Sequence, residues 1–314
     1  MNKPLDATEL ERAGTTGPRL VLFVEEGGGD WHARRLAKAL GALGATVMTT
    51  TLKACAFDTR AASGLEIPGF FGQLPDGAFV RSVSTGTLEQ ITFRLGILHA
   101  LRESGVRVWN DARSIERCVD KSTATFLFQK AGLPTPPTRV VEGLEGAVAH
   151  AKAEGRPLVV KPLFGSQGNG ISRARSVEEL PPPEAVGHVY YTQQYLRNDD
   201  ATHFEDWRVF VSAGAIVAAM VRRGKSWITN VHQGAEPGSH DPCDEMSRLA
   251  LAAVAAIGAD YAGVDLIRGP DGRLMVLEIN SNPAWKGLQS VTHVDIASRL
   301  ARDFMASLGV VQPR

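Results

Sequence analysis

The sequence predicts an α/β fold in which apolar strands alternate with amphipathic helices, and three observations support this. The chain of 314 residues is 44% hydrophobic and 22% charged, which is ordinary for a globular protein. A β-α-β pattern opens the chain, and a β-hairpin that carries polar side chains lies near its end. At about 100–200 residues per domain, this length accommodates two or three domains.

Charge and cysteine usage exclude several classes of protein. The formal net charge is zero, so neither a nucleic-acid nor a membrane partner is expected. The cysteines Cys55, Cys118 and Cys243 are far apart, which argues against a disulfide scaffold or zinc knuckle and favours a cytoplasmic location. No apolar run approaches the ~18 residues of a transmembrane helix. The polar residues 1–18 lack the apolar core of a signal peptide and are expected to form a flexible N-terminus.

The first strand is expected at residues 19–24, a continuous apolar run typical of a buried parallel strand. Asp30 is placed to cap a helix from Trp31 to Leu43, and Ala45–Thr49 predicts the next strand. The Gly27-Gly28-Gly29-Asp30 segment lacks the G-x-G-x-x-G spacing, and no acidic residue ends the second strand. Dinucleotide binding at this loop is therefore disfavoured.

Two further strands are expected at Ala78–Ser82 and Val106–Asn110, separated by a helix over Thr85–Leu101. Aliphatic residues at helical spacing predict the core-facing stripe of that helix. They are Leu88, Ile91, Leu95 and Leu98. Residues 19–115 therefore predict a small doubly wound α/β unit.

The middle of the chain contains a glycine-rich loop after a strand that carries a lysine. A helix over Asp120–Gly132 is followed by the stiff Pro-rich segment 133–137, a plausible domain boundary. The strand ending at Lys161 then runs into a loop whose glycines are Gly165, Gly168 and Gly170. Their backbone N–H groups can form a nest for phosphate oxygens, although an ordinary turn is the alternative. No Gly-Lys-Ser/Thr opens a helix here, so the loop is not a Walker A motif.

Three apolar segments follow, and two arginines accompany the last pair. Val189–Leu196 reads as a strand that runs into a linker, and Asp206–Ser212 with Ala215–Val221 reads as two paired strands. Arg208 and Arg222 lie in or beside these apolar strands, where a buried cation requires an anionic partner. The anionic partner of each arginine could be a carboxylate or phosphate of a bound ligand, or a local acidic residue such as Asp206.

The hairpin near the C-terminus consists of two apolar runs, Val264–Ile267 and Leu274–Ile279, around a Gly-Pro-Asp-Gly turn. A symmetric turn places Asp265 opposite Val276, with Glu278 at the diagonal position about 7–8 Å away. Alternation of side chains then predicts four residues on one side of the sheet: Asp265, Val276, Glu278 and Asn280.

The three oxygen-bearing side chains of this hairpin favour a Mg²⁺ site over a zinc site, because Mg²⁺ prefers carboxylate and carbonyl oxygen. Ordinary solvent-facing strand residues are the alternative interpretation. A β-bulge would also move one set of side chains to the other face.

The order of these motifs resembles the ATP-grasp superfamily, specifically its RimK-type α-L-glutamate ligases. The resemblance runs from Ala78 to Ala297 and rests on the Lys121 helix followed by VVKPLFGSQGNGI, QQYL, DWRVFV, RRGKSWITNVHQGA, AGVDLIR and VLEINSNP. The N-terminal segment from Phe79 looks closest to the branch that glutamylates tetrahydromethanopterin-type C1 carriers. The resemblance implies a doubly wound pre-ATP-grasp domain at 19–115. It implies an ATP-grasp domain at 116–314, whose two α+β subdomains (138–195 and 196–310) clamp ATP.

The resemblance also implies roles for individual residues. Contacts to ATP are expected from Lys121, Lys161, Gly165, Ser166, Gln167, Gly168, Gly170, Asp206 and Thr229, and from the adenine hinge Gln194-Tyr195. Ligands for two Mg²⁺ ions, with Mn²⁺ as a substitute, are expected to be Asp265, Glu278 and Asn280. Catalytic candidates are Arg222, then Arg208, with Asn230 near the phosphates and substrate. The chain departs from the family pattern at two positions. It has Gln194 where family members often have Glu, and Ile228 where some relatives have a basic residue. The second departure argues against a protein substrate.

The implied reaction forms an amide through an acylphosphate. A substrate carboxylate attacks the γ-phosphate of ATP, and an amine, by resemblance that of L-glutamate, then displaces phosphate. The expected partners are ATP, L-glutamate and a small carboxylated acceptor related to tetrahydromethanopterin; a homo-oligomer is left open. The alternatives are glutamylation of a protein C-terminus, ligation of another amino acid, or a non-catalytic ATP-binding regulator.

Overall fold

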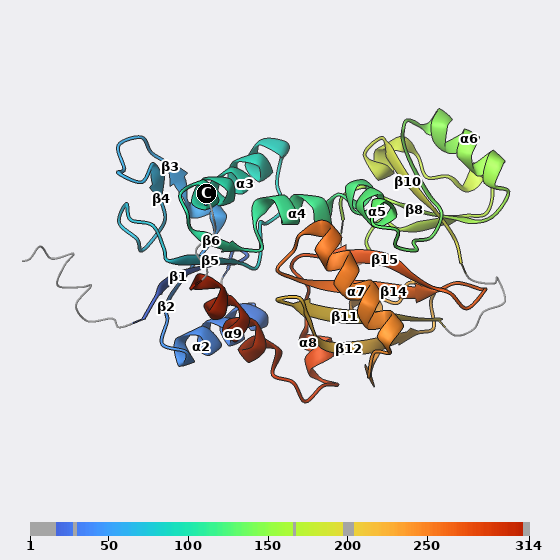
Figure 1. The fold of residues 1–314 in the computed structure, drawn as a ribbon. Coiled ribbons are helices and arrows are strands. Elements are labelled where there is room, and N and C mark those ends of the chain that lie inside the picture. Colours follow the sequence, from blue (N-terminus) through green and yellow to red (C-terminus); the bar gives the residue numbers. More distant parts are fainter. Residues whose placement is uncertain (1–16, 28–29, 166–167, 197–203, 310–314) are drawn as a thin grey trace, which may run out of the picture. The chain divides into compact units, whose positions relative to one another are not determined.

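The computed structural model describes residues 17–27, 30–165, 168–196 and 204–309 (Figure 1). Nearly all of the expected flexible N-terminus, together with Ser166 and Gln167, lies outside these ranges. The chain divides into two compact units, one of residues 1–112 with 295–314 and one of residues 113–294. No helix in the described ranges is long and apolar enough to cross a membrane.

The first unit is built on a four-stranded parallel sheet of order β2-β1-β5-β6. Figure 1 shows α3 on one face of this sheet and α2 with α9 on the other, so the doubly wound prediction is confirmed. Its elements are β1 (Arg19–Phe23), α2 (Trp31–Ala42), β2 (Thr46–Thr50), β3 (Ala56–Phe57), β4 (Leu65–Glu66), β5 (Gly77–Val80), α3 (Leu88–Glu103), β6 (Arg107–Trp109) and α9 (Ile296–Leu308). The helix α4 (Ala112–Val119), which the sequence did not predict, begins at the unit boundary.

The last helix of the chain, α9, belongs to the first unit. Its buried face packs against α2, and Phe304 meets the rings of Phe79 and Trp109 at centroid distances of 5.3 and 5.8 Å. The predicted division placed residues 116–314 in one domain, and the structure differs from it here. The apolar face of α9 covers part of the parallel sheet, because Phe304 and Leu308 lie directly over Gly77 of β5.

The core-facing stripe predicted for α3 is wrong in its first turns. Leu88 is 77% exposed, and the buried positions of this helix begin at Arg94 and continue at Ile97, Leu98 and Leu101. Arg94 occupies the inner face because its guanidinium group donates hydrogen bonds to the carbonyl groups of Val83, Ser84 and Thr85. A charged side chain can be buried when its donors are satisfied in this way.

The second unit contains two antiparallel sheets. The smaller sheet has the order β7-β10-β8-β9 and packs against α6. The larger sheet has the order β13-β12-β11-β14-β15. The elements are α5 (Lys121–Lys130), β7 (Thr138–Glu142), α6 (Leu144–Glu154), β8 (Leu158–Lys161), β9 (Ser172–Ala174), β10 (Val189–Gln194), β11 (Phe204–Ser212), β12 (Ala215–Gly224), β13 (Glu236–His240), α7 (Asp244–Ile257), β14 (Tyr261–Arg268), β15 (Leu274–Asn280) and α8 (Lys286–Gln289).

The main core of the second unit lies between the larger sheet and α7. Met246, Leu249 and Ala253 of α7 are buried against Val264 and Leu266 of β14, among other apolar residues. One face of the sheet is thereby closed to solvent, which leaves the other face for polar side chains.

Replacement of Leu249 by Ala tests this packing. The side chain is fully buried, so the free energy of unfolding of the second unit should fall by about 2–5 kcal/mol through lost burial and a residual cavity. Denaturant unfolding followed by circular dichroism measures the change. The neighbouring Arg248→Ala variant is the control, because Arg248 is exposed and should cost less than about 0.5 kcal/mol. Equal losses from both variants would contradict the placement of α7.

Candidate active site

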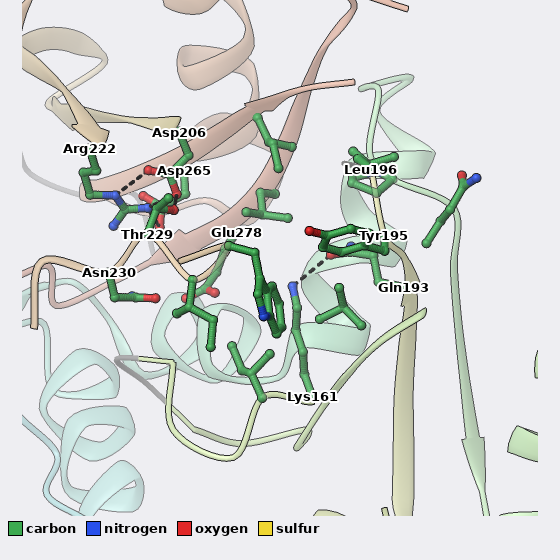
Figure 2. Close-up of a pocket in the computed structure, with 18 residues that line it drawn as sticks. Lys161, Gln193, Tyr195, Leu196, Asp206, Arg222, Thr229, Asn230, Asp265 and Glu278 are labelled. Atoms are coloured by element: carbon green, nitrogen blue, oxygen red, sulfur yellow. Dashed lines mark hydrogen bonds and ion pairs between the residues drawn. The ribbon is translucent and has the colours of Figure 1, made fainter. Parts of the chain in front are cut away.

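A pocket lies between the two sheets of the second unit (Figure 2). The space between its lining atoms is about 690 Å³ when open solvent at its mouth is included. Most predicted site residues line it: Lys161, Gln194, Tyr195, Asp206, Arg222, Thr229, Asn230, Asp265 and Glu278. A smaller adjoining cavity shares Lys161 and Glu278 and is lined by Lys121 as well.

The register of the β14–β15 hairpin differs from the symmetric one predicted. Asp265 pairs directly with Glu278, whereas Leu266 pairs with Val276, because a bulge interrupts the pairing between Asp265 and Leu266. The predicted pairing of Asp265 with Val276 is therefore wrong, and Val276 belongs to the core on the α7 side. A bulge opposes two residues of one strand to one of the other, and here it brings Glu278 to the face of Asp265.

Four charged side chains, which we call the ion-pair network, cross the centre of the larger sheet: Arg222, Asp206, Arg208 and Asp265. Arg222 pairs in register with Asp206, and Arg208 pairs in register with Asp265. Nε and Nη2 of Arg222 donate to the Asp206 carboxylate at 2.6 and 2.5 Å. The same two atoms of Arg208 donate to Asp265 at 2.6 and 2.7 Å, and Arg222 also reaches Asp265 at 3.0 Å. Thr229 donates its hydroxyl hydrogen to Asp206 at 2.7 Å.

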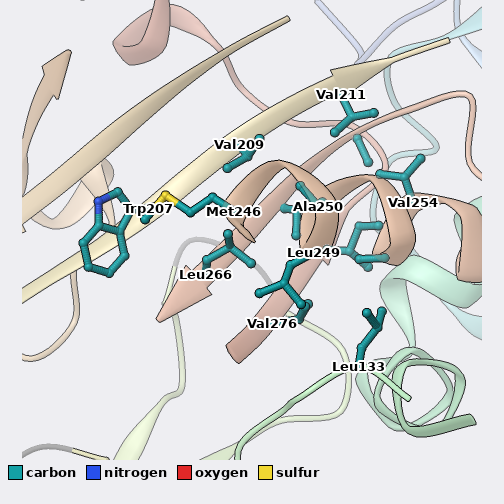
Figure 3. Close-up of a cluster of buried hydrophobic side chains, with 14 of the residues drawn as sticks. Leu133, Trp207, Val209, Val211, Met246, Leu249, Ala250, Val254, Leu266 and Val276 are labelled. Carbon is teal, nitrogen blue, oxygen red and sulfur yellow. The ribbon is translucent and has the colours of Figure 1, made fainter. Parts of the chain in front are cut away.

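Side-chain alternation along β11 explains why this network can be buried. Trp207, Val209 and Val211 point to the α7 core (Figure 3), so Asp206 and Arg208 point to the opposite face. Asp206, Arg222 and Asp265 are all less than 5% exposed, and two cations balance two anions. Such charges are tolerated in the interior only when paired in good geometry.

The arginines also set the ionisation of Asp265. Burial by itself raises the pKa of the Asp265 carboxyl, but the adjacent Arg208 and Arg222 outweigh it and hold that pKa below its ordinary value. Burial likewise opposes the charge on Arg222, yet Asp265 and Asp206 raise the pKa of its guanidinium group. Asp206 differs from Asp265, because burial raises the pKa of the Asp206 carboxyl although Arg222 and Thr229 act in the opposite direction.

Two lysines are cations without a carboxylate within ion-pair distance among the described residues. Lys161 is 5% exposed, and burial lowers the pKa of its ammonium group to about 8, although Glu278 acts in the opposite direction. Lys121 follows the helix cap Asp120 and donates to the carbonyl groups of Leu163 and Gly165. Burial lowers the pKa of Lys121 as well, against the opposing charges of Glu278 and Asp120. Two nearby positive charges of this kind suit a polyanionic ligand.

Two of the predicted magnesium ligands, Glu278 and Asn280, have side chains that are not engaged by the rest of the described structure. Glu278 forms no hydrogen bond or ion pair with any described residue, and the buried Nδ2 of Asn280 has no hydrogen-bond partner in that part of the chain. Neither side chain is therefore used to hold the fold. No group of three or more His, Cys, Asp or Glu side chains in the described ranges can hold a metal. The predicted ligands Asp265, Glu278 and Asn280 offer oxygen atoms, which Mg²⁺ prefers, although Arg208 and Arg222 already hold the Asp265 carboxylate.

The glycine-rich loop requires glycine at Gly168. Its φ is +76°, and a Cβ atom there would approach Nε2 of Gln233 at 2.6 Å and Oδ1 of Asn230 at 3.0 Å. Gly165 and Gly170 also have positive φ angles. The loop therefore lies close to the polar segment that contains Thr229 and Asn230.

Two backbone N–H groups of the predicted adenine hinge already donate hydrogen bonds to other parts of the chain. The backbone N–H groups of Gln194 and Tyr195 donate to the carbonyl groups of Pro137 and Pro157 at 2.8 and 3.0 Å. Leu196, which the prediction did not include, lines the pocket, and its N–H has no partner among the described residues.

Several other lining residues were also missed. They are Pro136, Val159, Ile171, Gln193, Leu196, Trp227, Ile228, Ile267 and Leu277. Gln193 is the one with a sequence signal, since a buried strand that contains a glutamine must place its amide against a partner. The apolar members carried no such signal, because an aliphatic residue at a site looks like one in a core.

A comparison with protein-family models matches residues 118–304, more than half of the chain, to the RimK-like ATP-grasp domain. The chain therefore belongs to the RimK-like ATP-grasp family and is a ligase, as predicted. Enzymes with this domain use ATP and Mg²⁺.

Named relatives and solved structures agree with this family. The tetrahydromethanopterin:α-L-glutamate ligase of Methanococcus maripaludis is 35% identical over 230 residues, which covers 71% of this chain and 76% of that protein. The enzyme of the same name from Methanocaldococcus jannaschii is 34% identical over 72% of this chain and 77% of its own length. The ATP-grasp ligase PsnB with its minimal precursor, Mg and ADP shares the fold at a TM-score of 0.71 and 20% identity. The match covers 92% of this chain and 97% of that one.

Neutralising Asp265 should destabilise the protein far more than neutralising Glu278. In Asp265→Asn the buried Arg222 and the partly buried Arg208 lose an anion, and we expect the free energy of unfolding to fall by about 3–5 kcal/mol. The matched Glu278→Gln change removes a carboxylate that holds no partner in the described residues, and should cost less than about 1 kcal/mol. Denaturant unfolding of both variants at neutral pH measures the difference. Equal costs would show that Asp265 is not the anion on which the arginines depend.

Proposed function

We propose that this protein is an α-L-glutamate ligase that uses ATP and Mg²⁺ to join L-glutamate to a small carboxylated acceptor related to tetrahydromethanopterin. The observation that carries this proposal is a pocket in which Lys121 and Lys161 face the unpaired Glu278 carboxylate. The acceptor class rests on the relatives named above, which are 34–35% identical over more than two thirds of this chain. No observation favours a protein C-terminus, another amino acid or a non-catalytic regulator.

In the first step, a carboxylate oxygen of the acceptor forms a bond to the γ-phosphorus of ATP, and the bond from that phosphorus to the bridging oxygen breaks. The products are an acylphosphate and ADP. Both reactants are anions, so their approach requires nearby positive charge. Lys161 and Lys121 supply two ammonium groups, and the N–H groups of the Gly165–Gly170 loop can add hydrogen bonds to phosphate oxygens.

Asp265, Glu278 and Asn280 are the residues that would hold magnesium, either as two Mg²⁺ ions or with Mn²⁺ in their place. Bound Mg²⁺ neutralises phosphate charge and polarises the P–O bonds. Arg208 keeps the Asp265 carboxylate ionised and fixes its direction through two hydrogen bonds. Glu278, which makes no such bonds to described residues, is free to turn toward a cation.

The apolar part of the pocket suits the base of the nucleotide. Tyr195 and Trp227 meet edge to face at 5.8 Å, and Val159, Ile171 and Leu277 complete the lining. With the Gln194 and Tyr195 N–H groups already bonded, we assign recognition of adenine to the Leu196 N–H. The replacement of the family's usual Glu by Gln194 then has little effect on adenine binding, because a backbone N–H group recognises the base.

In the second step, the amine nitrogen of glutamate attacks the acyl carbon, phosphate leaves, and the nitrogen loses a proton to give the amide. The carbonyl oxygen carries negative charge as the tetrahedral intermediate forms. Arg222 lines the pocket, and its Nη1 is the guanidinium nitrogen without a partner among the described residues. Arg222 is therefore the residue that stabilises this charge, with Asn230 alongside, and Arg208 acts through Asp265.

The reaction is tested by incubating the purified protein with ATP, Mg²⁺, L-glutamate and a tetrahydromethanopterin-type acceptor. We expect ADP release that depends on both glutamate and acceptor, and a product heavier than the acceptor by one or more glutamyl residues. Mass spectrometry identifies that product. Tight ATP binding without turnover on any carboxylated acceptor would instead support a regulator.

Glu278→Ala should reduce ligation by more than about 100-fold, because a pocket anion that would hold the cation is lost. Mg²⁺ affinity in the presence of ADP, measured by calorimetry, should fall in parallel. Glu245→Ala removes an exposed carboxylate from α7 of the same unit and should leave both quantities unchanged. Near-normal turnover of the Glu278 variant would refute the metal assignment.

The affinity for ATP should decline as the pH rises through about 8, the pKa of Lys161. Below this value the ammonium group is charged and attracts phosphate, whereas above it the neutral amine cannot. ATP is already fully ionised in this range, so its own charge does not change. Dissociation constants measured at pH values on both sides of 8 give the profile. In Lys161→Arg, whose side chain stays charged, the decline should disappear; a persistent decline would assign it to another group.

A further inference from the structure

The Lys161 ammonium group has one hydrogen-bond partner among the described side chains, and that partner is neutral. Its Nζ donates to Oε1 of Gln193 at 2.8 Å, and Gln193 is 2% exposed. The face of Tyr191 lies 5.6 Å from the same nitrogen. The charged groups that act on Lys161 are Glu278 from β15, Lys121 from α5 and Asp265 from β14. The direct contact is thus made by an amide.

The orientation of the Gln193 amide is set by the residues behind it. Its Nε2 donates to Oγ1 of Thr138 at 3.0 Å and to the Tyr191 hydroxyl at 3.2 Å. The Thr138 hydroxyl donates its own hydrogen to the Pro136 carbonyl at 2.7 Å. Its oxygen can therefore only accept a hydrogen bond from Gln193. The Gln193 NH₂ group must therefore face Thr138, and its oxygen must face Lys161.

This arrangement crosses three neighbouring strands. Lys161 of β8 is the register partner of Tyr191 in β10, and Gln193 of β10 is the register partner of Thr138 in β7. The Tyr191 hydroxyl also contacts Thr125 of α5 at 2.8 Å, in the helix that begins with Lys121. A chain of neutral groups thus ties Lys161 to the sheet and to the helix of the second lysine.

We propose that Gln193 is a positioning residue that holds the Lys161 ammonium group toward the ATP phosphates, with Thr138 and the Pro136 carbonyl fixing the direction of its amide. The proposal rests on the function proposed above. A neutral acceptor suits this task, since a carboxylate in its place would neutralise the lysine and repel the phosphates. The amide holds the side chain in place and leaves its charge available for the ligand.

A double-mutant cycle on ATP binding tests the proposal. Gln193→Met removes all three amide hydrogen bonds at similar volume, and we expect ATP to bind on the order of tenfold more weakly, the effect of the one charge-assisted hydrogen bond to Lys161. Because Gln193 acts through Lys161, the Lys161→Met/Gln193→Met double variant should bind ATP as Lys161→Met alone does, within about twofold. Thr138→Val should show a smaller loss than Gln193→Met.

Adenosine, which lacks phosphates, separates positioning from general damage. Its affinity should be unchanged in every variant, and thermal unfolding confirms that each one folds. Gln129→Met, at an exposed position of α5, is the matched control and should bind ATP normally. An unchanged ATP affinity in Gln193→Met, losses that multiply in the double variant, or an equal loss for adenosine would overturn the positioning role alone. Failure of the unmodified protein to bind ATP would overturn the proposed function itself.

Discussion

The ion-pair network across β12, β11 and β14 is the constraint on which the site depends. Arg222 and both aspartates are buried and Arg208 is partly buried, so removing any one would leave an unmatched charge in or beside the interior. The network satisfies Asp206 and Asp265 and fixes Arg222 by its Nε and Nη2 atoms. Lys121, Lys161 and Glu278 have no ion pair within the described residues, and they can respond to a ligand together with the Nη1 atom of Arg222.

The same strands build the core and the site, because a strand shows alternate residues to its two faces. The α7 side of β11 is apolar, while its other side carries the charges. The bulge beside Asp265 completes the charged face, because it shifts the register by one residue and brings Glu278 opposite Asp265. The packing of α7 on one face of the larger sheet thus fixes the positions of the charged side chains on the other face.

Much of this could be predicted from the sequence. Apolar runs located ten of the described strands, and polar residues within them marked Lys161, Asp265 and Glu278 as unusual. The short or polar strands β3, β4, β7, β9 and β13 were not predicted, because they lack such a run. The bulge could not be predicted, because pairing depends on how β15 packs against α7, and a symmetric turn gave the wrong partner for Asp265. The division of α9 from the second unit and the role of Gln193 also depend on contacts between segments distant in sequence, which no local pattern contains.

The central claim is that the pocket lined by Lys161, Glu278 and the Leu196 backbone binds a magnesium nucleotide. The most direct measurement is an experimental structure of the protein with Mg²⁺ and a non-hydrolysable ATP analogue. The account predicts adenine at the Leu196 N–H, phosphate oxygens within hydrogen-bond distance of the Lys161 ammonium group, and metal coordinated by Asp265, Glu278 and Asn280. A nucleotide bound elsewhere, or a metal held by none of these three side chains, would contradict it.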